Sequence, residues 1–430
     1  MKKERVVIIG NGVAGIATAR HLRKRSDASI TVISAESKHF FSRTALMYIY
    51  MGHMRYEDTK PYSDDFWVKN RIDLLQASVQ QVITEKKQLI LQDERIIPYD
   101  KLVLATGSKT ATYGWKGMEL AGVQGLYSLQ DLRQMELNTQ GIKQAVVVGG
   151  GLIGVEMAEM LHSRGIQVKF LIREDRFWGS VLPQEEGNLI GRHLSKEGIE
   201  LRYQTELDEI LGDRRVTGIK TESGETIACD FLGICTGVKP NVAFLKDSGI
   251  KIDRGILVDE YLQTNLPDIY AVGDCAQLIQ PQSGRKAIEA VWYVGKMMGE
   301  VLGATLSGQK TKYQPGQWFN SAKFFHIEYQ TYGEVPSKPI PGMASLYWED
   351  EKQEKAIRLV YEEASEKLLG LHTLGIRLKH EQCDEWLNSE IRLTKLIPNL
   401  QLANFDPEFY KDPFPDIQHA FNTYLSRSES

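Results

Sequence analysis

Two glycine-rich segments are the parts of the sequence whose residue types and spacing could do chemistry. Both have the pattern Gly-x-Gly-x-x-Gly. In such a turn the first glycine allows a tight bend, the second lets backbone N–H groups approach a pyrophosphate, and the third lets the following helix pack closely. The N-terminus of that helix adds unsatisfied N–H donors and the positive end of its dipole. Each segment therefore predicts a turn that binds a dinucleotide, and the glycines concerned are Gly10, Gly12 and Gly15 in the first and Gly149, Gly151 and Gly154 in the second.

Both glycine-rich segments lie in the same predicted frame of strands and helices. Each follows a short apolar strand (6–9 and 146–148), opens a segment with helical spacing, and leads to a second strand (30–33 and 168–172). Each copy continues with a hairpin-like stretch and closes with a strand that runs into Thr-Gly. Strand, turn, helix and strand is the order that a dinucleotide-binding turn requires. The two copies predict an α/β fold with two Rossmann-like dinucleotide-binding domains.

The composition is that of an ordinary globular protein. Of 430 residues, 42% are hydrophobic and 25% charged, and the net charge is −4. These values exclude a disordered or fibrous chain, and the mild acidity argues against a nucleic-acid partner. No apolar run approaches about 18 residues, so we expect a cytoplasmic protein without stable membrane insertion. The four cysteines and the scattered histidines show no disulfide framework, metal-ligand or catalytic-triad spacing, so no metal site is predicted.

The motifs GNGVAG, ATG, GGGLIG, TG and TNLPDIYAVGD follow one another along the chain. Together they resemble the FAD/NAD(P)-dependent pyridine nucleotide oxidoreductases, the flavoproteins with two dinucleotide-binding domains. The resemblance covers about residues 5–312. It implies one tightly held FAD and one exchangeable NAD(P)H. It also implies an FAD-binding domain split into 1–113 and 234–312, an inserted NAD(P)-binding domain at 114–233, and a C-terminal α+β interface domain at 313–430 that makes a homodimer possible.

For the flavin, the resemblance assigns the family's binding roles to residues of the first domain. Glu36 would bind the adenosine ribose, and the backbone of Val79 would meet the adenine. Asp274 would accept a hydrogen bond from the ribityl chain, while Thr106 and Gly107 mark the chain crossing near the cofactor. Capping of a turn or helix is the alternative role for Thr106 and Asp274. The predicted FAD-binding residues are Gly10, Gly12, Val13, Ala14, Gly15, Glu36, Arg43, Val79, Ala105, Thr106, Gly107, Gly273 and Asp274.

For the nicotinamide, the resemblance points to the second glycine-rich turn and to Glu156, two positions after its last glycine. In relatives this glutamate lies near the nicotinamide and the flavin and often pairs with a lysine. Tyr48 stands at the position of that lysine. Arg43 is therefore the candidate cation beside the flavin, and a structural ion pair is its alternative role.

The end of the strand 168–172 bears on the choice between NADH and NADPH. Ile172 stands where an acid would favour the 2′-hydroxyl of NADH. Arg173 and Arg176 could instead meet the 2′-phosphate of NADPH, whereas Glu174 lies near the spacing expected for the acid. We expect a preference for NADPH, with a solvated turn of mixed charge as the alternative.

The segment 287–296 matches the helix whose N-terminus, in relatives, points at the flavin N1–C2=O edge. The positive end of its dipole would stabilise the reduced, anionic flavin there. Glu289 and Trp292 lie on this segment and complete the predicted catalytic set with Arg43 and Glu156. A core position is the alternative for Trp292.

The positions of the cysteines limit which reactions of this family the chain could carry out. Residues 37–54 contain no cysteine, although disulfide reductases of this family carry Cys-x4-Cys there and members that reduce peroxide or oxygen carry a single cysteine. A Cys-x-x-Cys pair is also absent from the nicotinamide domain, and Cys275 is expected only to pack. Hydride should therefore pass from NAD(P)H to flavin N5, and electrons then to an external acceptor, without a protein thiol.

The region after residue 312 carries strand signals within 318–335, 356–361 and 367–374, followed by helical spacing over 381–396. These features predict a small interface domain of sheet and helix. The tail from Asn404 is aromatic and rich in proline. We expect this tail to pack on the surface, and contact with a partner or second subunit is the alternative.

The predicted function is an FAD-dependent NAD(P)H oxidoreductase whose acceptor is a small redox protein or a quinone. Two other functions stay open. One is a flavoprotein that works as a binding module or switch, of the apoptosis-inducing-factor-like kind. The other is a type II NADH dehydrogenase at the membrane, which would need an amphipathic C-terminal anchor.

Overall fold

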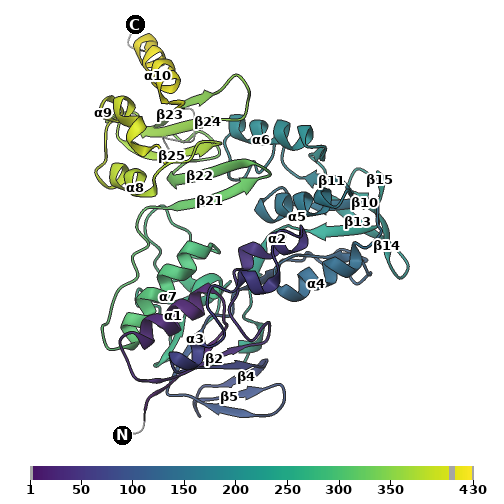
Figure 1. Cartoon of the computed structure of the whole chain (residues 1–430), viewed down its shortest axis with the longest axis vertical. Helices are drawn as coiled ribbons and strands as arrows, with labels where there is room; N and C mark the ends of the chain where they lie inside the picture. The colour runs from purple at the N-terminus through teal and green to yellow at the C-terminus, as the bar shows by residue number, and fades with distance from the viewer. Residues whose placement is uncertain (1–2, 406–411, 429–430) are drawn as a thin grey trace. The chain divides into compact units, whose positions relative to one another are not determined.

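The chain divides into two compact units, which Figure 1 shows in a computed structural model that describes residues 3–405 and 412–428. Unit one comprises residues 1–114, 124–140 and 236–315, and unit two comprises 115–123, 141–235 and 316–430. Residues 124–140 thus group with the first glycine-rich turn, although the sequence places them inside the segment 114–233. The three-domain division at those boundaries stays a prediction.

Unit one is built on a parallel five-stranded sheet with the order β19-β7-β1-β2-β3. The β-branched run of β1 lies at its centre, where Val7 is opposite Thr31 of β2 on one side and Leu102 of β7 on the other. Continuous apolar strands of this kind are typical of parallel sheets covered on both faces. The strands are β1 (Arg5–Ile9), β2 (Ser29–Ser34), β3 (Ile72–Gln76), β7 (Lys101–Leu104) and β19 (Ile269–Ala271).

Helices α1 (Val13–Arg23) and α7 (Trp292–Leu306) pack unusually close together in unit one. Gly299 and Gly303 of α7 face α1, where a Cβ would lie 2.4 Å from the Ala14 carbonyl oxygen and 2.5 Å from the His21 Cβ, respectively. The other elements of this unit are α2 (Leu46–Tyr50), α3 (Phe66–Lys69), β4 (Val79–Ile83), β5 (Gln88–Leu91), β6 (Ile96–Pro98), β8 (Ser108–Thr110), α4 (Leu129–Asn138), β17 (Val238–Pro240), β18 (Ile256–Val258) and β20 (Ala276–Leu278).

Unit two contains the second parallel sheet, with the order β12-β11-β10-β16-β9. Its central strand β10 pairs with β11 and β16, as β1 pairs with β2 and β7. The elements around this sheet are β9 (Val123–Gln124), β10 (Gln144–Val148), α5 (Leu152–Ser163), β11 (Gln167–Ile172), α6 (Gln184–Lys196), β12 (Glu200–Tyr203), β13 (Leu207–Gly212), β14 (Val216–Thr221), β15 (Thr226–Ala228) and β16 (Phe231–Ile234). The prediction of an α/β fold with two Rossmann-like sheets is confirmed.

The C-terminal part of unit two is an antiparallel sheet with the order β21-β22-β25-β24-β23. Helices α8, α9 and α10 pack on it through a core that includes Leu359, Trp386 and Phe421. The elements are β21 (Phe319–Phe324), β22 (Ile327–Gly333), β23 (Met343–Glu349), β24 (Ala356–Glu362), β25 (Leu368–Leu374), α8 (His380–Asn388), α9 (Leu393–Leu396) and α10 (Phe414–Ser428). The predicted sheet-plus-helix arrangement is confirmed, whereas residues 406–411 of the predicted surface tail lie outside the described residues.

A buried ion cluster connects helix α6 to this antiparallel sheet within unit two. The Glu186 carboxylate, which is fully buried, contacts Arg358 Nε at 2.7 Å and His372 Nε2 at 2.7 Å. Burial raises the pKa of Glu186, but the His372 and Arg358 contacts outweigh it and hold the pKa at about 2. Removing one member of such a cluster leaves an uncompensated buried charge, so it fixes α6 in place.

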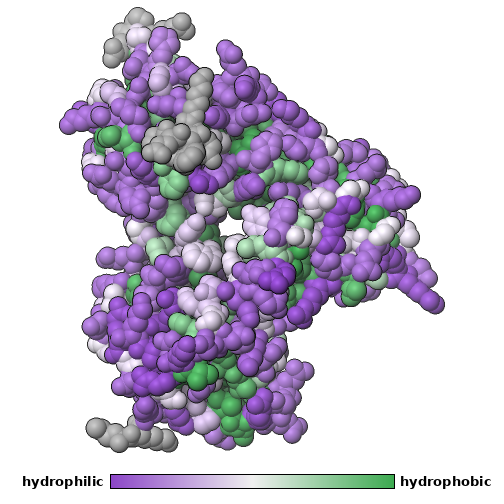
Figure 2. Space-filling model, viewed as in Figure 1, coloured by the Kyte–Doolittle hydropathy of each residue, from purple (hydrophilic) through white to green (hydrophobic). Residues whose placement is uncertain are grey.

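The surface is mostly polar. On the face shown in Figure 2, hydrophilic side chains cover most of both units, and apolar patches are smaller. Among the described residues, none of the helices combines the length and the apolar character needed to cross a bilayer.

Candidate dinucleotide-binding sites

The first glycine-rich turn has a backbone that only glycine fits. Gly10 has a φ of +114°, and a Cβ there would lie 2.0 Å from the Ala105 carbonyl oxygen. A Cβ on Gly15 would lie 2.1 Å from the Gly10 carbonyl oxygen, so helix α1 starts in direct backbone contact with the turn. The structure therefore brings together Gly10, Gly15 and Ala105, as the prediction of one binding site requires.

Gly12 differs from its two neighbours because it faces open space. A Cβ at Gly12 would have no heavy atom within 4 Å. Gly12 is also the N-cap of α1, and no side chain caps the helix there. An uncapped helix N-terminus beside open space is a ready site for an anion, and this space is the one that a side chain would fill. The turn thus fits the pyrophosphate of a dinucleotide.

Glu36 and Arg43 form a two-contact ion pair in unit one. Arg43 donates from Nη1 to Glu36 Oε1 at 2.9 Å and from Nη2 to Glu36 Oε2 at 2.6 Å, and the Leu129 backbone N–H donates to Oε1 at 2.8 Å. Burial lowers the pKa of Arg43, but its bonds to Glu36 raise it further, so the net shift is upward. The ion pair that the sequence left as an alternative for Arg43 is present, and it joins two predicted FAD-binding residues.

Tyr127 connects several predicted flavin residues and was missed by sequence reasoning. Its hydroxyl donates to Asp274 Oδ2 at 3.2 Å and accepts from the Ser108 backbone N–H at 2.9 Å. Its ring lies 4.5 Å from the Arg43 guanidinium carbon, and a Cβ on Gly107 would lie 2.6 Å from its hydroxyl. Burial raises the pKa of Asp274. A lone tyrosine in the segment 124–140 gives no motif, so only the fold could reveal it.

The remaining predicted flavin residues belong to several segments of unit one. A Cβ on Gly273 would lie 2.9 Å from the Ala14 Cβ, so these two positions touch, and Val13 follows Gly12 at the start of α1. Thr106 donates from its hydroxyl to the Asn241 carbonyl at 2.8 Å. Val79 begins β4, directly after a backbone bond from Ala77 N–H to the Ser34 carbonyl at 3.0 Å.

Residues 287–291 are not helical, which corrects the prediction for 287–296. Helix α7 begins at Trp292, after Val291 in an extended conformation with φ −133° and ψ 137°. Glu289 lies before the helix and pairs with Arg285 Nε at 2.7 Å and Nη2 at 2.6 Å, with both side chains 6% exposed. This buried ion pair joins two residues four positions apart within the segment that precedes the helix. Trp292 is 38% exposed, so its alternative as a core residue is wrong.

The second glycine-rich turn repeats the backbone of the first. Gly149 has a φ of +112°, and a Cβ on Gly154 would lie 2.2 Å from the Gly149 carbonyl oxygen. The space at Gly151 is more restricted than at Gly12, because a Cβ there would lie 3.7 Å from the Trp178 indole nitrogen. Gly151 is again an N-cap without a capping side chain, here of α5. The turn fits a second pyrophosphate.

The two arginines that suggested NADPH have different surroundings. Arg176 donates from Nη2 to the carbonyls of Gly179 and Ser337, both at 3.1 Å, and its side chain is 12% exposed. Arg173 is 69% exposed and contacts Glu174 at 3.3 Å. Arg176 thus has a structural role within unit two, and the case for a 2′-phosphate site rests on Arg173 alone.

Glu156 is a half-buried carboxyl on α5 with a changed acidity. Burial, with a smaller contribution from the Glu159 carboxylate, raises its pKa to about 7. Cys235 lies close enough for Glu156 to affect its pKa, which burial already raises. A carboxyl that titrates near neutral pH can hold or release a proton under ordinary conditions.

The cysteines are unsuited to redox work. All four are free and buried, at Cys229, Cys235, Cys275 and Cys383. Burial raises the pKa of each thiol, to about 12 for Cys229. Since the thiolate is the reactive form, buried thiols of high pKa are inert.

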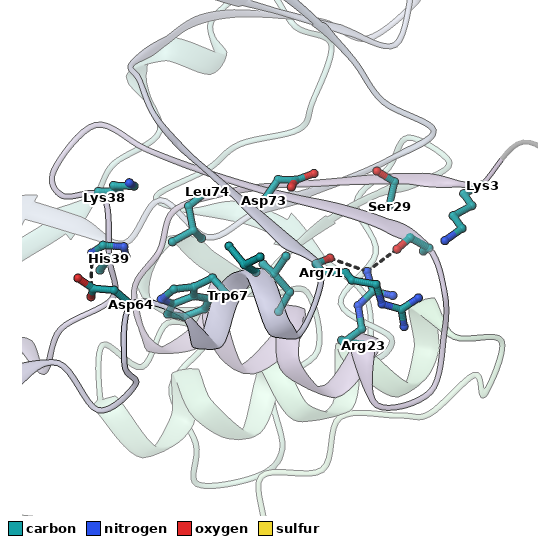
Figure 3. A pocket seen from close by; sticks show the side chains of 13 residues that line it. Lys3, Arg23, Ser29, Lys38, His39, Asp64, Trp67, Arg71, Asp73 and Leu74 are labelled. Atoms are coloured by element: carbon teal, nitrogen blue, oxygen red, sulfur yellow. Dashed lines mark hydrogen bonds and ion pairs between the residues drawn. The ribbon is translucent and has the colours of Figure 1, made fainter.

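A pocket of about 530 Å³ lies elsewhere in unit one, along the edge strand β3 (Figure 3). Arg23, Arg71, Trp67 and Asp73 are among its lining residues, and none of the predicted site residues lines it. Arg23, one of the cationic side chains that line the pocket, already donates from Nη2 to the Arg71 backbone carbonyl at 2.9 Å.

The chain is similar to a family of known proteins over most of its length. Residues 4–297 match the family described as pyridine nucleotide-disulphide oxidoreductase. The nitrite reductase [NAD(P)H] of Bacillus subtilis is 33% identical over 280 residues, which are 64% of this chain and 35% of that protein, so the chain spans about a third of its length. The nitric oxide reductase FlRd-NAD(+) reductase of Vibrio vulnificus is 31% identical over 277 residues, covering 64% of this chain and 72% of that one. The crystal structure of a ferredoxin reductase from Rhodopseudomonas palustris aligns with a TM-score of 0.79 at 25% identity over 86% of this chain and 91% of that chain.

Proposed function

The chain belongs to the pyridine nucleotide-disulphide oxidoreductase family, whose members are NAD(P)H-dependent flavoprotein reductases, and we propose that it reduces a small redox protein through FAD without using a protein thiol. The observation that carries this proposal is the combination of two glycine-rich turns that fit pyrophosphates with cysteines that are all buried and unpaired.

The family implies FAD, and the residues of unit one fit it. The turn Gly10–Gly15 would hold the pyrophosphate, with the Glu36 carboxylate toward the adenosine ribose and Asp274 toward the ribityl chain. Arg43 is paired with Glu36 and lies against the Tyr127 ring, so we assign it the role of holding the Glu36 carboxylate in place. When bound, FAD would accept hydride equivalents from the nicotinamide and release them as single electrons.

In unit two, the turn Gly149–Gly154 would hold the pyrophosphate of NAD(P)H, and Glu156 would lie toward the nicotinamide. Its pKa of about 7 lets this carboxyl be protonated at mildly acidic pH and charged at alkaline pH. Glu289 is neutralised by Arg285, so we assign it a positioning role for the segment before α7 rather than proton transfer. The exposed Trp292 would stand beside the flavin face.

For the acceptor, we propose a small iron–sulfur protein ahead of a quinone. Two of the similar proteins are named for a redox-protein partner, a ferredoxin in one and FlRd in the other. NADPH as the preferred coenzyme depends on Arg173 alone, because Arg176 is bound to carbonyl groups.

Anaerobic stopped-flow measurement of the purified flavoprotein tests this function. NADH or NADPH is mixed with the oxidised protein, and the reduced protein is then mixed with ferredoxin, rubredoxin or a quinone. We expect reduction on the timescale of turnover and fastest reoxidation by an iron–sulfur protein. Slow reduction that leaves a long-lived reduced state would favour the switch function instead, and fastest reoxidation by a quinone would change the acceptor.

A cysteine variant tests the thiol-free route separately. Cys275→Ala removes the cysteine that follows Asp274, and Cys383→Ala, in the antiparallel sheet region, is the matched control for loss of a buried thiol. Both are expected to keep the electron-transfer rates of the natural protein. A selective loss of acceptor reduction in Cys275→Ala would show that a thiol takes part.

A further inference from the structure

Three potential metal ligands come together in unit two, apart from the turn Gly149–Gly154. They are His193 on α6, Glu197 directly after that helix, and His326 in the turn between β21 and β22. Positions four apart share one helix face, which places His193 beside Glu197. One ligand atom from each residue lies within 4.8 Å of the other two. The imidazole rings of the two histidines are 4.3 Å apart and nearly perpendicular, at 86°.

The His193 ring is buried and is fixed by a backbone hydrogen bond. It is 5% exposed, and one of its nitrogens bonds to the Phe324 backbone. Within residues 3–405 and 412–428, Nε2 is buried without a hydrogen-bond partner, so the bond to Phe324 is made by Nδ1. Ligand histidines in proteins usually donate their second nitrogen to a carbonyl or carboxylate in this way, which leaves the other nitrogen's lone pair for the metal.

The unpartnered nitrogen is the second observation that points to a ligand. A buried polar atom left without a hydrogen bond costs about 1–3 kcal/mol, so it is rare in native structures. A ring nitrogen of His193 lies within 4.8 Å of a ligand atom of each of the other two members of the cluster. A cation between them would supply the missing partner.

We propose that His193, Glu197 and His326 bind one divalent transition-metal ion, with Zn²⁺ as the best match. Two imidazoles and a carboxylate suit zinc, and such three-residue sites keep a fourth position for water or another ligand. Metal–ligand distances of about 2.0–2.1 Å place tetrahedral ligand atoms about 3.3 Å apart. The cluster must therefore contract slightly on binding, and His326 can do so because its side chain is 62% exposed.

The surrounding structure fixes the elements that carry the cluster. The Glu186 cluster anchors α6 to the antiparallel sheet, so the helix that carries His193 and Glu197 is held against the turn that carries His326. Glu159 adds a second carboxylate close to Glu197, while Lys196 and Lys323 add nearby positive charge. These positive and negative charges oppose one another around the cluster. The proposal therefore depends on the two imidazoles rather than on the neighbouring charges.

The test uses the flavin-loaded protein after removal of metals with a chelator. Zn²⁺ is titrated by calorimetry, and Co²⁺ is added to read its d–d absorption at wavelengths beyond the flavin bands. We expect one equivalent of bound metal and a tetrahedral Co²⁺ spectrum without a thiolate band. His326→Ala and Glu197→Gln change residues that reach solvent, and each should weaken Zn²⁺ binding at least tenfold.

His419→Ala is the matched control, because His419 is an exposed histidine on α10 of the same unit. It should bind Zn²⁺ as the natural protein does. The proposal is overturned if the natural protein takes up no Zn²⁺ at micromolar concentration, or if His326→Ala binds it unchanged. Far-ultraviolet circular dichroism of every variant separates loss of metal from loss of fold.

Discussion

The two glycine-rich turns have the same backbone but different surroundings. In both, the first glycine has a φ near +113°, at +114° for Gly10 and +112° for Gly149, and the third glycine touches its carbonyl. The turn in unit one is followed by Glu36, which Arg43 and the Leu129 backbone hold in place. The corresponding strand end in unit two carries Arg173, which is 69% exposed, and Glu174, which is 26% exposed and contacts Arg173.

This difference shows that the turn and the side chains beside it contribute separately to binding. The backbone provides N–H donors for a pyrophosphate in either case. Preorganised polar groups reduce the ordering cost of binding, which favours a cofactor that stays bound. Exposed side chains that must be ordered each time suit a coenzyme that exchanges. The same turn can therefore serve a resident flavin in unit one and a transient nicotinamide in unit two.

The largest effect is expected from Gly12→Ala. A Cβ at Gly12 meets no protein atom within 4 Å, so the variant should fold, but the methyl group would occupy the space of the pyrophosphate. We expect a colourless protein with normal circular dichroism. Gly10→Ala is the contrasting variant, since its Cβ would meet the Ala105 carbonyl at 2.0 Å and should prevent folding of unit one. Full flavin content in Gly12→Ala would refute this site.

Gly151→Ala should have a smaller effect and leave the flavin in place. Its Cβ would lie 3.7 Å from the Trp178 indole, an ordinary contact, so the loss falls on coenzyme binding alone. We expect KM for NAD(P)H to rise about tenfold, which corresponds to about 1.4 kcal/mol of binding free energy. Steady-state kinetics with saturating acceptor measures it. Loss of flavin together with coenzyme affinity would mean that the two turns do not act separately.

Glu156→Gln changes a carboxyl on the helix that follows the second turn. The helix after the first turn has Ala17 at the equivalent position. The folded pKa of about 7 exceeds the ordinary 4.5. As pH rises from 4.5 to 7, the unfolded chain releases this proton more readily, so Glu156 destabilises the fold progressively and most above pH 7. Glutamine removes that cost, and we expect a gain of up to about 3 kcal/mol at pH 8 and none at pH 4.

Thermal unfolding of both proteins at several pH values measures this gain. A gain that is equal at pH 5 and pH 8 would show that the charge of Glu156 is not its cause.

The smallest effect is expected from Arg173→Ala, which removes the exposed cation at the end of β11. If this guanidinium meets a 2′-phosphate, the ratio of kcat/KM for NADPH over NADH should fall about fivefold, as for a charge pair near the surface that is worth about 1 kcal/mol. Arg176→Ala is not a matched test, because that side chain supports the Gly179 and Ser337 carbonyls. An unchanged ratio would leave the coenzyme without an arginine to select it.

Much of this architecture could be predicted from the sequence because it is local. The glycine spacing and the apolar strands before it lie within a few residues of each other, and both turns and both parallel sheets follow from them. The start of α7 at Trp292 could not be predicted, because Val291 occupies the N-cap position and no capping side chain marks the boundary in the sequence. The roles of Tyr127 and the meeting of His193 with His326 depend on contacts between distant segments, which no spacing reports.

The glycines at 299 and 303 let α7 and α1 touch through their main chains, with no side-chain layer to absorb a displacement. Helix α1 begins at the turn that would hold the flavin phosphates. A single methyl group added at Gly299 or Gly303 of α7 would therefore displace α1 and, with it, that turn. A substitution on α7 would therefore weaken flavin binding without any contact between α7 and the phosphates.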